Sequence, residues 1–208
     1  MVFIYEKIFE GGKIMTLYEC RINKIFDLLK YYNAKRIIDF GCGDGKLVRY
    51  LNQSNAFKEL ACVEISKKQI TKLIKNFGGN NKIKIFDQSF FEYNELFKKY
   101  DAAILSEVIE HLTNAEIDTL LNLILNTYCP QILIITTPNK SFNINLPTLH
   151  NGLRHSSHLF EFTIEDVEDF LEKTQEKFSL YTAYRGYCDK NQSTHFIIIE
   201  KRKNDEQS

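Results

Sequence analysis

Apolar and polar positions follow one another along this chain in the pattern of successive strands and helices, from about residue 35 onward. Short, mainly apolar runs predict five buried β-strands, at 35–40, 60–65, 83–86, 101–105 and 131–136. Stretches with helical spacing predict helices between them, at 46–54, 66–77 (with Ser66 as the N-cap) and 113–128. This order predicts an α/β fold, in which a mainly parallel sheet is covered by helices on both faces.

The regular pattern lapses after Pro138 and resumes near Thr163. The stretch 139–158 between them is predicted to be a long irregular loop, and loops of this length are more often functional than idle. Thr163 then caps a helix from Ile164 to about Lys173. Two closing strands, 178–184 and 194–200, predict a C-terminal antiparallel hairpin at the sheet edge, which brings the predicted sheet to seven strands.

The length of 208 residues is enough for one well-buried core, so a single domain is predicted over 1–200. Within it, 1–30 is expected to be a helical extension that packs over the cleft, and 139–158 to be the loop that serves substrate and metal. The remaining residues, 201–208, are predicted to form a polar tail that frays.

Charge and cysteine content narrow the class of protein. The 27 basic and 27 acidic side chains give zero net charge, so no global field draws the chain toward nucleic acid or a membrane. No apolar run approaches the roughly 20 residues that span a bilayer, and the first residues lack the order of a signal peptide. The five cysteines show no C-x-x-C spacing and indicate free thiols in a reducing compartment. These features predict a cytoplasmic protein without a membrane partner.

The predicted turn from the first strand into the first helix, residues 39–45, contains three glycines in the spacing G-x-G-x-G. Glycines at such a turn let the backbone approach a ligand closely. The spacing differs from the G-x-G-x-x-G of dinucleotide enzymes, and Asp39 before the loop indicates that an amino group is held there. Glu64 ends the second strand, the place from which a carboxylate takes both hydroxyls of an adenosine ribose.

This combination resembles the S-adenosylmethionine-dependent methyltransferases with a Rossmann-like fold. The resemblance implies that Asp39, Gly41, Gly43 and Glu64 line the pocket for S-adenosylmethionine. It also implies that Ser89, after the third strand, contacts the adenine side; a serine that only caps its loop is the alternative. For the glycine loop and its acidic residues together, the alternative is an unrelated α/β protein with a glycine turn and an acidic residue at a strand end.

Two segments roughly fifty residues apart, 107–112 and 154–163, carry the second candidate site. On a helix, Glu107, Glu110 and His111 stand at i, i+3 and i+4 and share one face. His158 could bring a further ligand from across a cleft and complete the mixed oxygen and nitrogen shell that suits a catalytic divalent cation. The alternative is a helix start with a structural histidine, since many small-molecule methyltransferases carry a similar stretch without metal.

Together with Thr137-Pro138-Asn139 and Phe142-Asn143, these two segments resemble the HEN family, the small-RNA methyltransferases that modify the 2′-hydroxyl of a 3′-terminal ribose. The resemblance spans about residues 35–173 and is most specific at 154–163. It implies a divalent metal, Mg²⁺ or Mn²⁺, and an RNA 3′ end with free 2′-OH and 3′-OH as substrate. The metal ligands that it implies are Glu107, Glu110, His111 and His158.

The chain departs from the family pattern at Ser157, where the family usually has Asp, and at Phe162, where it usually has Trp. An Asp at the first place could orient a neighbouring imidazole, so Ser157 is expected to weaken that support. Phe162 keeps the aromatic packing and loses only an indole N–H.

The predicted catalytic residues are His111, one of the metal ligands, and His155, a general base or an orienting residue. A loop histidine bonded to backbone is the alternative for His155. Arg154 is expected either to clamp the terminal phosphodiester or to pair with a surface carboxylate. Phe142 is expected either to stack on a nucleotide beside Lys140 or, by default, to lie in the core. The two other histidines are interpreted as structural: His150 and His195.

Two other functions compete with this interpretation. A small-molecule O-methyltransferase acting on a quinone or catechol would share fold and cofactor but would leave residues 154–163 unexplained. An RNA chaperone or inactive subunit that binds the cofactor would have a decayed metal site, whereas all four implied ligands are present. The neutral charge suggests modest RNA affinity or recruitment by a protein partner.

Overall fold

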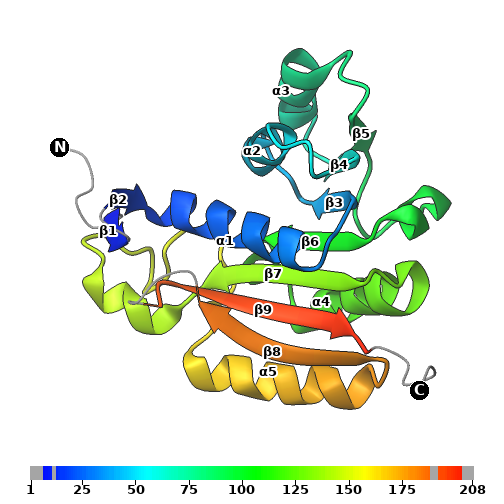
Figure 1. The fold of residues 1–208 in the computed structure, drawn as a ribbon. Helices are drawn as coiled ribbons and strands as arrows, with labels where there is room; N and C mark the ends of the chain where they lie inside the picture. The colour runs from blue at the N-terminus through cyan, green and yellow to red at the C-terminus, as the bar shows by residue number, and fades with distance from the viewer. Residues whose placement is uncertain (1–6, 11–12, 188–191, 203–208) are drawn as a thin grey trace.

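The computed structural model describes residues 7–10, 13–187 and 192–202, and it contains a seven-stranded sheet with helices on both faces (Figure 1). The order of strands across the sheet is β5-β4-β3-β6-β7-β9-β8. The strand bounds are β3 Arg36–Phe40, β4 Glu59–Glu64, β5 Ile83–Asp87, β6 Ala102–Ser106, β7 Ile132–Pro138, β8 Tyr181–Tyr187 and β9 Thr194–Lys201.

The first five strands of this sheet are parallel, and β9 lies antiparallel between β7 and β8. The predicted α/β fold, the parallel sheet and the C-terminal antiparallel hairpin are therefore confirmed. Because β3 pairs with β4 on one side and with β6 on the other, the loops that follow these three strands leave the sheet at the same edge.

Helices cover the sheet because successive strand residues point to opposite faces. Leu105 of β6 is buried in one core cluster with Val167, whereas its neighbour Ile104 is buried in the other with Ile25 and Leu73. The face of Leu105 is covered by α4 and α5, and the opposite face by α1, α2 and α3. The helix bounds are α1 Leu17–Tyr31, α2 Lys46–Asn52, α3 Lys67–Phe77, α4 Asn114–Asn122 and α5 Ile164–Lys177.

Shorter helical turns fill several connections. These are the 3₁₀ turns η2 Glu95–Lys99, η3 Ile109–His111 and η5 Lys140–Asn145, and the π-helical turn η4 Leu123–Tyr128. The predicted helix at 113–128 is thus α4 continued by η4, and the predicted loop at 139–158 begins with η5. Ser66 stands at the N-cap of α3 as predicted, but its side chain makes no capping hydrogen bond.

The prediction of a helical segment over the first thirty residues is confirmed from residue 17, where α1 begins, and is wrong for the described residues before it. Strands β1 (Lys7–Glu10) and β2 (Lys13–Thr16) pair antiparallel before α1 begins. Helix α1 starts with a capping box at Thr16. The Thr16 side chain accepts from the Glu19 N–H, and the Glu19 side chain accepts from the Thr16 N–H. Glycine pairs are typical of turns and unfavourable in helix interiors, so the Gly11-Gly12 pair in the sequence is a signal against a continuous helix.

Helix α5 and strand β9 begin where they were predicted, at Ile164 and Thr194, but two other bounds differ. Helix α5 runs to Lys177, four residues beyond the predicted end, and β8 starts at Tyr181. The predicted tail begins with the last residue of β9, Lys201, and 203–208 lie outside the described residues, as does Cys188. Across the described residues, the structure contains no helix long and apolar enough to cross a membrane.

Candidate active site

The glycine loop joins β3 to α2 as predicted, and its glycines serve different purposes. Gly45 has φ +76°, and a Cβ placed on it would lie 2.6 Å from Cδ2 of Leu73 and 2.7 Å from Cε2 of Phe77 on α3. Gly43 has φ +57°, but a Cβ there would meet no described atom within 4 Å. Gly45 is thus required by packing against α3, whereas Gly43 borders open space in which a ligand could lie against the backbone.

Glu64, at the end of β4, is bonded directly to this loop. Its carboxylate accepts hydrogen bonds from the backbone N–H groups of Gly43 at 2.9 Å, Ile65 at 3.0 Å and Ser66 at 2.8 Å. A carboxylate offers about four lone-pair sites, so it retains acceptor capacity for a ligand hydroxyl. The structure therefore brings Glu64 and the glycine loop together, as the sequence predicted.

Asp39 lies beneath the loop in β3 and is only 3% exposed. Burial, with a smaller effect from the negative charge of Glu64, raises the pKa of Asp39 to about 8. Without a cation beside it, this carboxyl group therefore holds a proton near neutral pH. A ligand amino group would stabilise its charged form, which is the role predicted for Asp39.

The first turn of α1 approaches the same loop. The Tyr18 ring centroid lies 5.9 Å from Nζ of Lys46, and the phenol has a raised pKa, mainly through burial, with Asp44 and Asp39 among the charges that act on it. On the other side, Ser89 follows β5, and its Oγ accepts a hydrogen bond from the Phe91 N–H at 3.2 Å. Ser89 therefore does cap its own loop, and its contact with a cofactor remains a prediction.

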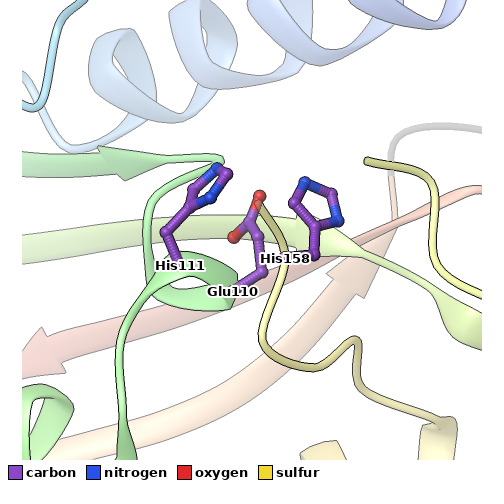
Figure 2. Close-up of side chains that lie close together, drawn as sticks. All are labelled: Glu110, His111 and His158. Atoms are coloured by element: carbon purple, nitrogen blue, oxygen red, sulfur yellow. The ribbon is translucent and has the colours of Figure 1, made fainter. Parts of the chain in front are cut away.

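Three of the predicted metal ligands converge on one point. Glu110, His111 and His158 each offer a ligand atom, and these atoms all lie within 4.8 Å of one another. Figure 2 shows the Glu110 carboxylate between the two imidazole rings. Glu110 and His111 belong to η3, whereas His158 lies in the segment before α5; the Leu159 N–H joins the two by donating to the Glu110 carbonyl at 2.8 Å.

Hydrogen bonds orient both imidazoles toward the shared point. Nδ1 of His158 lies 2.6 Å from Oε1 of Glu161, and Nδ1 of His111 lies 3.1 Å from the carbonyl oxygen of Ser157. Carboxylate and carbonyl oxygens only accept, so both Nδ1 atoms donate and each neutral ring keeps its lone pair on Nε2. Burial lowers the pKa of His111, which keeps this ring neutral. Neutral imidazoles held in this way are ready metal ligands.

The carboxylate of Glu110 is fully buried, and its Oε2 accepts from Oγ1 of Thr137 at 3.1 Å. Its Oε1 is buried and has no hydrogen-bond partner among the residues that the structure describes. Burial, and then the charge of Glu107, raise the pKa of Glu110 well above its usual range. An orphaned carboxylate oxygen beside two imidazole lone pairs fits a divalent cation, because the cation would supply the missing partner.

Glu107 does not share a helical face with these residues, so that prediction is wrong. It adopts φ +57°, and helical structure begins only at Ile109. The Glu107 N–H donates to the Thr136 carbonyl at 2.9 Å, which extends the pairing of β6 with β7 before the chain turns away. Its carboxylate pairs with Nη1 of Arg21 at 3.0 Å, outside the group of three, and its role as fourth metal ligand stays a prediction.

His155 lies next to the metal-ligand group, with its ring centroid 5.8 Å from that of His158. The Ser157 N–H donates to Nδ1 of His155 at 3.2 Å, so Nδ1 accepts and the neutral ring carries its proton on Nε2. Oγ of Ser157 lies 2.7 Å from this Nδ1 and 3.1 Å from Nδ1 of His111. Ser157 thus contacts two imidazoles at the position where the family usually has Asp.

Glu161 is a residue that the sequence reasoning missed. Its fully buried carboxylate accepts from His158 Nδ1 at 2.6 Å, from the Arg154 N–H at 2.7 Å and from Nδ2 of Asn143 at 2.6 Å. A carboxylate that bonds the far nitrogen of a ligand histidine fixes its ring orientation and raises its basicity. The spacing H-x-x-E was the available signal in the sequence.

The Arg154 side chain bonds to two residues of the 139–158 loop and to Ser193. Its Nε donates to Oδ1 of Asn143 at 2.7 Å, and its Nη2 donates to the carbonyls of Asn139 at 2.7 Å and Ser193 at 2.8 Å. Neither predicted role of Arg154 describes these contacts. Phe142 is buried under its guanidinium, in agreement with the default expectation of a core residue.

The structural interpretation of His195 is supported. The residue is fully buried, Nε2 lies 3.1 Å from the carbonyl oxygen of Phe162, and burial lowers the pKa of the imidazole to about 4.

Comparison with known proteins places this arrangement in a family. A family model described as a methyltransferase domain matches residues 18–175. The chain belongs to the methyltransferase domain family. Two curated relatives, both named small RNA 2′-O-methyltransferase, are 24% identical over 199 residues (Gallus gallus) and 25% identical over 199 residues (Schizosaccharomyces pombe). These matches cover 87% and 81% of this methyltransferase domain, but only 53% and 51% of the relatives' lengths.

A solved structure, the methyltransferase domain of bacterial CtHen1-C, superposes with a TM-score of 0.79 at 26% identity. It covers 90% of this methyltransferase domain and 100% of its own chain. The resemblance to the HEN family that the motifs indicated is therefore confirmed, together with the Rossmann-like methyltransferase fold.

Proposed function

We propose that this chain transfers the methyl group of S-adenosylmethionine to the 2′-oxygen of the 3′-terminal ribose of an RNA, with the aid of a divalent cation. The convergence of Glu110, His111 and His158 on one point carries the proposal. The names of the relatives support the RNA 2′-hydroxyl as the acceptor. Because β3 and β6 are neighbours, the cofactor loop and η3 leave the sheet side by side.

S-adenosylmethionine supplies an electrophilic methyl group on its sulfonium. In the proposed pocket, Asp39 pairs with the amino group of the cofactor and Glu64 accepts from the ribose hydroxyls. Gly43 lets the ligand lie against the backbone, and Gly41, where a Cβ would lie 3.0 Å from Cγ2 of Val108, is proposed to line the pocket beside it. Ser89 is proposed to contact the adenine side. The open space over Gly43 and the raised pKa of Asp39 support this assignment.

Glu107, Glu110, His111 and His158 are the residues proposed to hold Mg²⁺ or Mn²⁺. A divalent cation in such a site supplies Lewis-acid chemistry, which lowers the pKa of a hydroxyl group that it binds. Two imidazoles make the donor set softer than the all-oxygen shell that Mg²⁺ prefers, so we expect Mn²⁺ to be at least as effective. Glu161 and Ser157 bond to the two rings at Nδ1, so both Nε2 lone pairs are left free for the proposed cation.

We assign His155 an orienting role in this mechanism. It contacts Ser157, which also contacts His111, so it helps to fix that ring. As a general base it would first have to give up its bond from the Ser157 N–H or shift its Nε2 proton. Orientation of the metal ligands and of the substrate is the main contribution that we propose for the protein itself.

The proposed partner is an RNA 3′ end. The chain has zero net charge, so we propose that it grips an RNA end with modest affinity or is recruited by a protein partner. A free 2′-OH and a free 3′-OH are both required in this proposal, because vicinal oxygens are the feature of an RNA 3′ end that a cation site can recognise.

The proposal is tested by methyl transfer from labelled S-adenosylmethionine in the presence of Mn²⁺. Three RNAs that differ only at the 3′ terminus are compared: one with 2′-OH and 3′-OH, one with a 2′-deoxy end and one with a 3′-phosphate. We expect label in the first RNA only. Equal methylation of all three would contradict the terminal-ribose proposal, and transfer that continues after exhaustive chelation would contradict the role of the metal.

A further inference from the structure

Arg21, in the second turn of α1, reaches the proposed metal site from outside both motif segments. Its Nη1 lies 3.0 Å from Oε2 of Glu107, and the two side chains are 16% and 25% exposed. The guanidinium also stacks on the Tyr18 ring, 5.6 Å from its centroid. This ion pair is shielded from solvent, so salt screens it less than a pair on the open surface.

Both carboxylate oxygens of Glu107 are occupied in this arrangement. Oε1 accepts from Oγ1 of Thr136 at 3.1 Å, and Oε2 faces Arg21. The backbone of Glu107 is fixed by its own bond to the Thr136 carbonyl. The Glu107 carboxylate lies outside the group of three, whose ligand atoms all lie within 4.8 Å of one another. Its side chain therefore has to turn to join Glu110, His111 and His158, and the pair with Arg21 then has to open.

Arg21 has room to release the carboxylate. Together with Tyr18 and Arg154 it lines a cavity of about 210 Å³, and its buried Nε has no hydrogen-bond partner in the described part of the chain. The positive charge of Arg21 also acts on Glu110, where it opposes the rise in pKa caused by burial. Arg21 thus supplies one positive charge beside Glu107 and Glu110, where a bound divalent ion would supply two.

We propose that Arg21 is a positioning residue. In the cation-free protein its guanidinium pairs with the Glu107 carboxylate, and binding of the divalent cation has to open this ion pair. This inference rests on the proposed metal site. It follows that Arg21 weakens cation binding to the RNA-free protein in two ways, by occupying a ligand and by adding a like charge nearby.

The test is the affinity of the purified protein for Mn²⁺, measured from the electron paramagnetic resonance signal of free Mn²⁺ without RNA or cofactor. Arg21→Gln should bind Mn²⁺ about five- to tenfold more tightly than the wild type, the size expected for one shielded ion pair that the bound state lacks. Lys30→Gln is the matched control, because it removes a positive charge from the last turn of the same helix and should leave the affinity unchanged. Arg21→Met serves as a second variant should the Gln variant fail to fold.

Combining Arg21→Gln with Glu107→Gln distinguishes release of the ion pair from the general effect of a nearby positive charge on cation binding. In that background Arg21→Gln should improve binding by less than about twofold, because no carboxylate remains to be released. An equal improvement in both backgrounds would overturn the ion-pair mechanism, and unchanged or weaker binding in Arg21→Gln would overturn the proposal as a whole. If the wild type and every variant bind no Mn²⁺, the proposed metal site itself is wrong and the inference is wrong with it.

Discussion

Replacement of Glu161 by Gln removes the negative charge behind His158 while keeping the shape of the side chain. The carboxylate accepts from three donors: Nδ1 of His158, the Arg154 N–H and Nδ2 of Asn143. Glutamine has one acceptor oxygen and one NH₂ group, so its nitrogen must face one of these donors. Asn143 cannot correct this by flipping, because its Oδ1 already accepts from Nε of Arg154. Every arrangement therefore leaves a buried donor unpaired.

The size of the effect follows from these contacts. One unpaired buried polar group costs about 1–3 kcal/mol of unfolding free energy, which urea titration measures. Loss of a carboxylate behind a ligand histidine typically weakens metal binding about 10- to 100-fold. Glu161→Gln should therefore bind Mn²⁺ about 10- to 100-fold more weakly, while binding of S-adenosylmethionine stays close to that of the wild type.

Rescue by excess metal distinguishes positioning of His158 from loss of fold. Methyl transfer by Glu161→Gln should recover as Mn²⁺ is raised, whereas a misfolded protein would not recover. Glu172→Gln, an exposed position on α5, is the matched control and should behave as the wild type does. Wild-type Mn²⁺ affinity in Glu161→Gln would refute the role that we give to this carboxylate.

Two further predictions concern the cofactor pocket. Glu64→Ala should weaken binding of S-adenosylmethionine at least tenfold by calorimetry, since a charge-assisted hydrogen bond contributes about 1.5–3 kcal/mol; unchanged affinity would remove Glu64 from the pocket. Burial raises the pKa of Asp39 to about 8, above its ordinary 3.8, so the folded state holds a proton that the unfolded chain loses. The unfolding free energy of the cofactor-free protein should therefore fall between about pH 4 and 8, and Asp39→Asn should show a flatter urea-derived profile.

The buried strands could be predicted from the sequence because strands covered on both faces form continuous apolar runs, as in Ile132 to Ile135. The β1–β2 hairpin could not, because two four-residue strands carry too little pattern to compete with the helical periodicity that follows them. The fold class thus follows from local patterns, and the point at which α1 begins follows from the capping box of Thr16 and Glu19.

The site shows the same division between local motif and tertiary contact. Glu110, His111 and His158 could be predicted because the motif records their identity and spacing. The left-handed backbone of Glu107 could not, since that conformation is uncommon for residues other than glycine and depends on the bond to Thr136. Arg21 acts through Glu107, a partner far away in sequence, and no local pattern identifies such a pair. Glu161 stands only three residues after His158, but the H-x-x-E spacing alone does not show that the two side chains bond to each other.

Periodate treatment of the RNA product tests most directly whether the methyl group is placed on the terminal ribose. Periodate cleaves a ribose only when its 2′ and 3′ hydroxyls are both free. RNA recovered after incubation with the wild-type protein, S-adenosylmethionine and Mn²⁺ should resist periodate, and RNA incubated with Glu110→Gln should remain sensitive. Labelled product that is still cleaved by periodate would contradict the proposed function, because its methyl group would then lie elsewhere than on the 3′-terminal ribose.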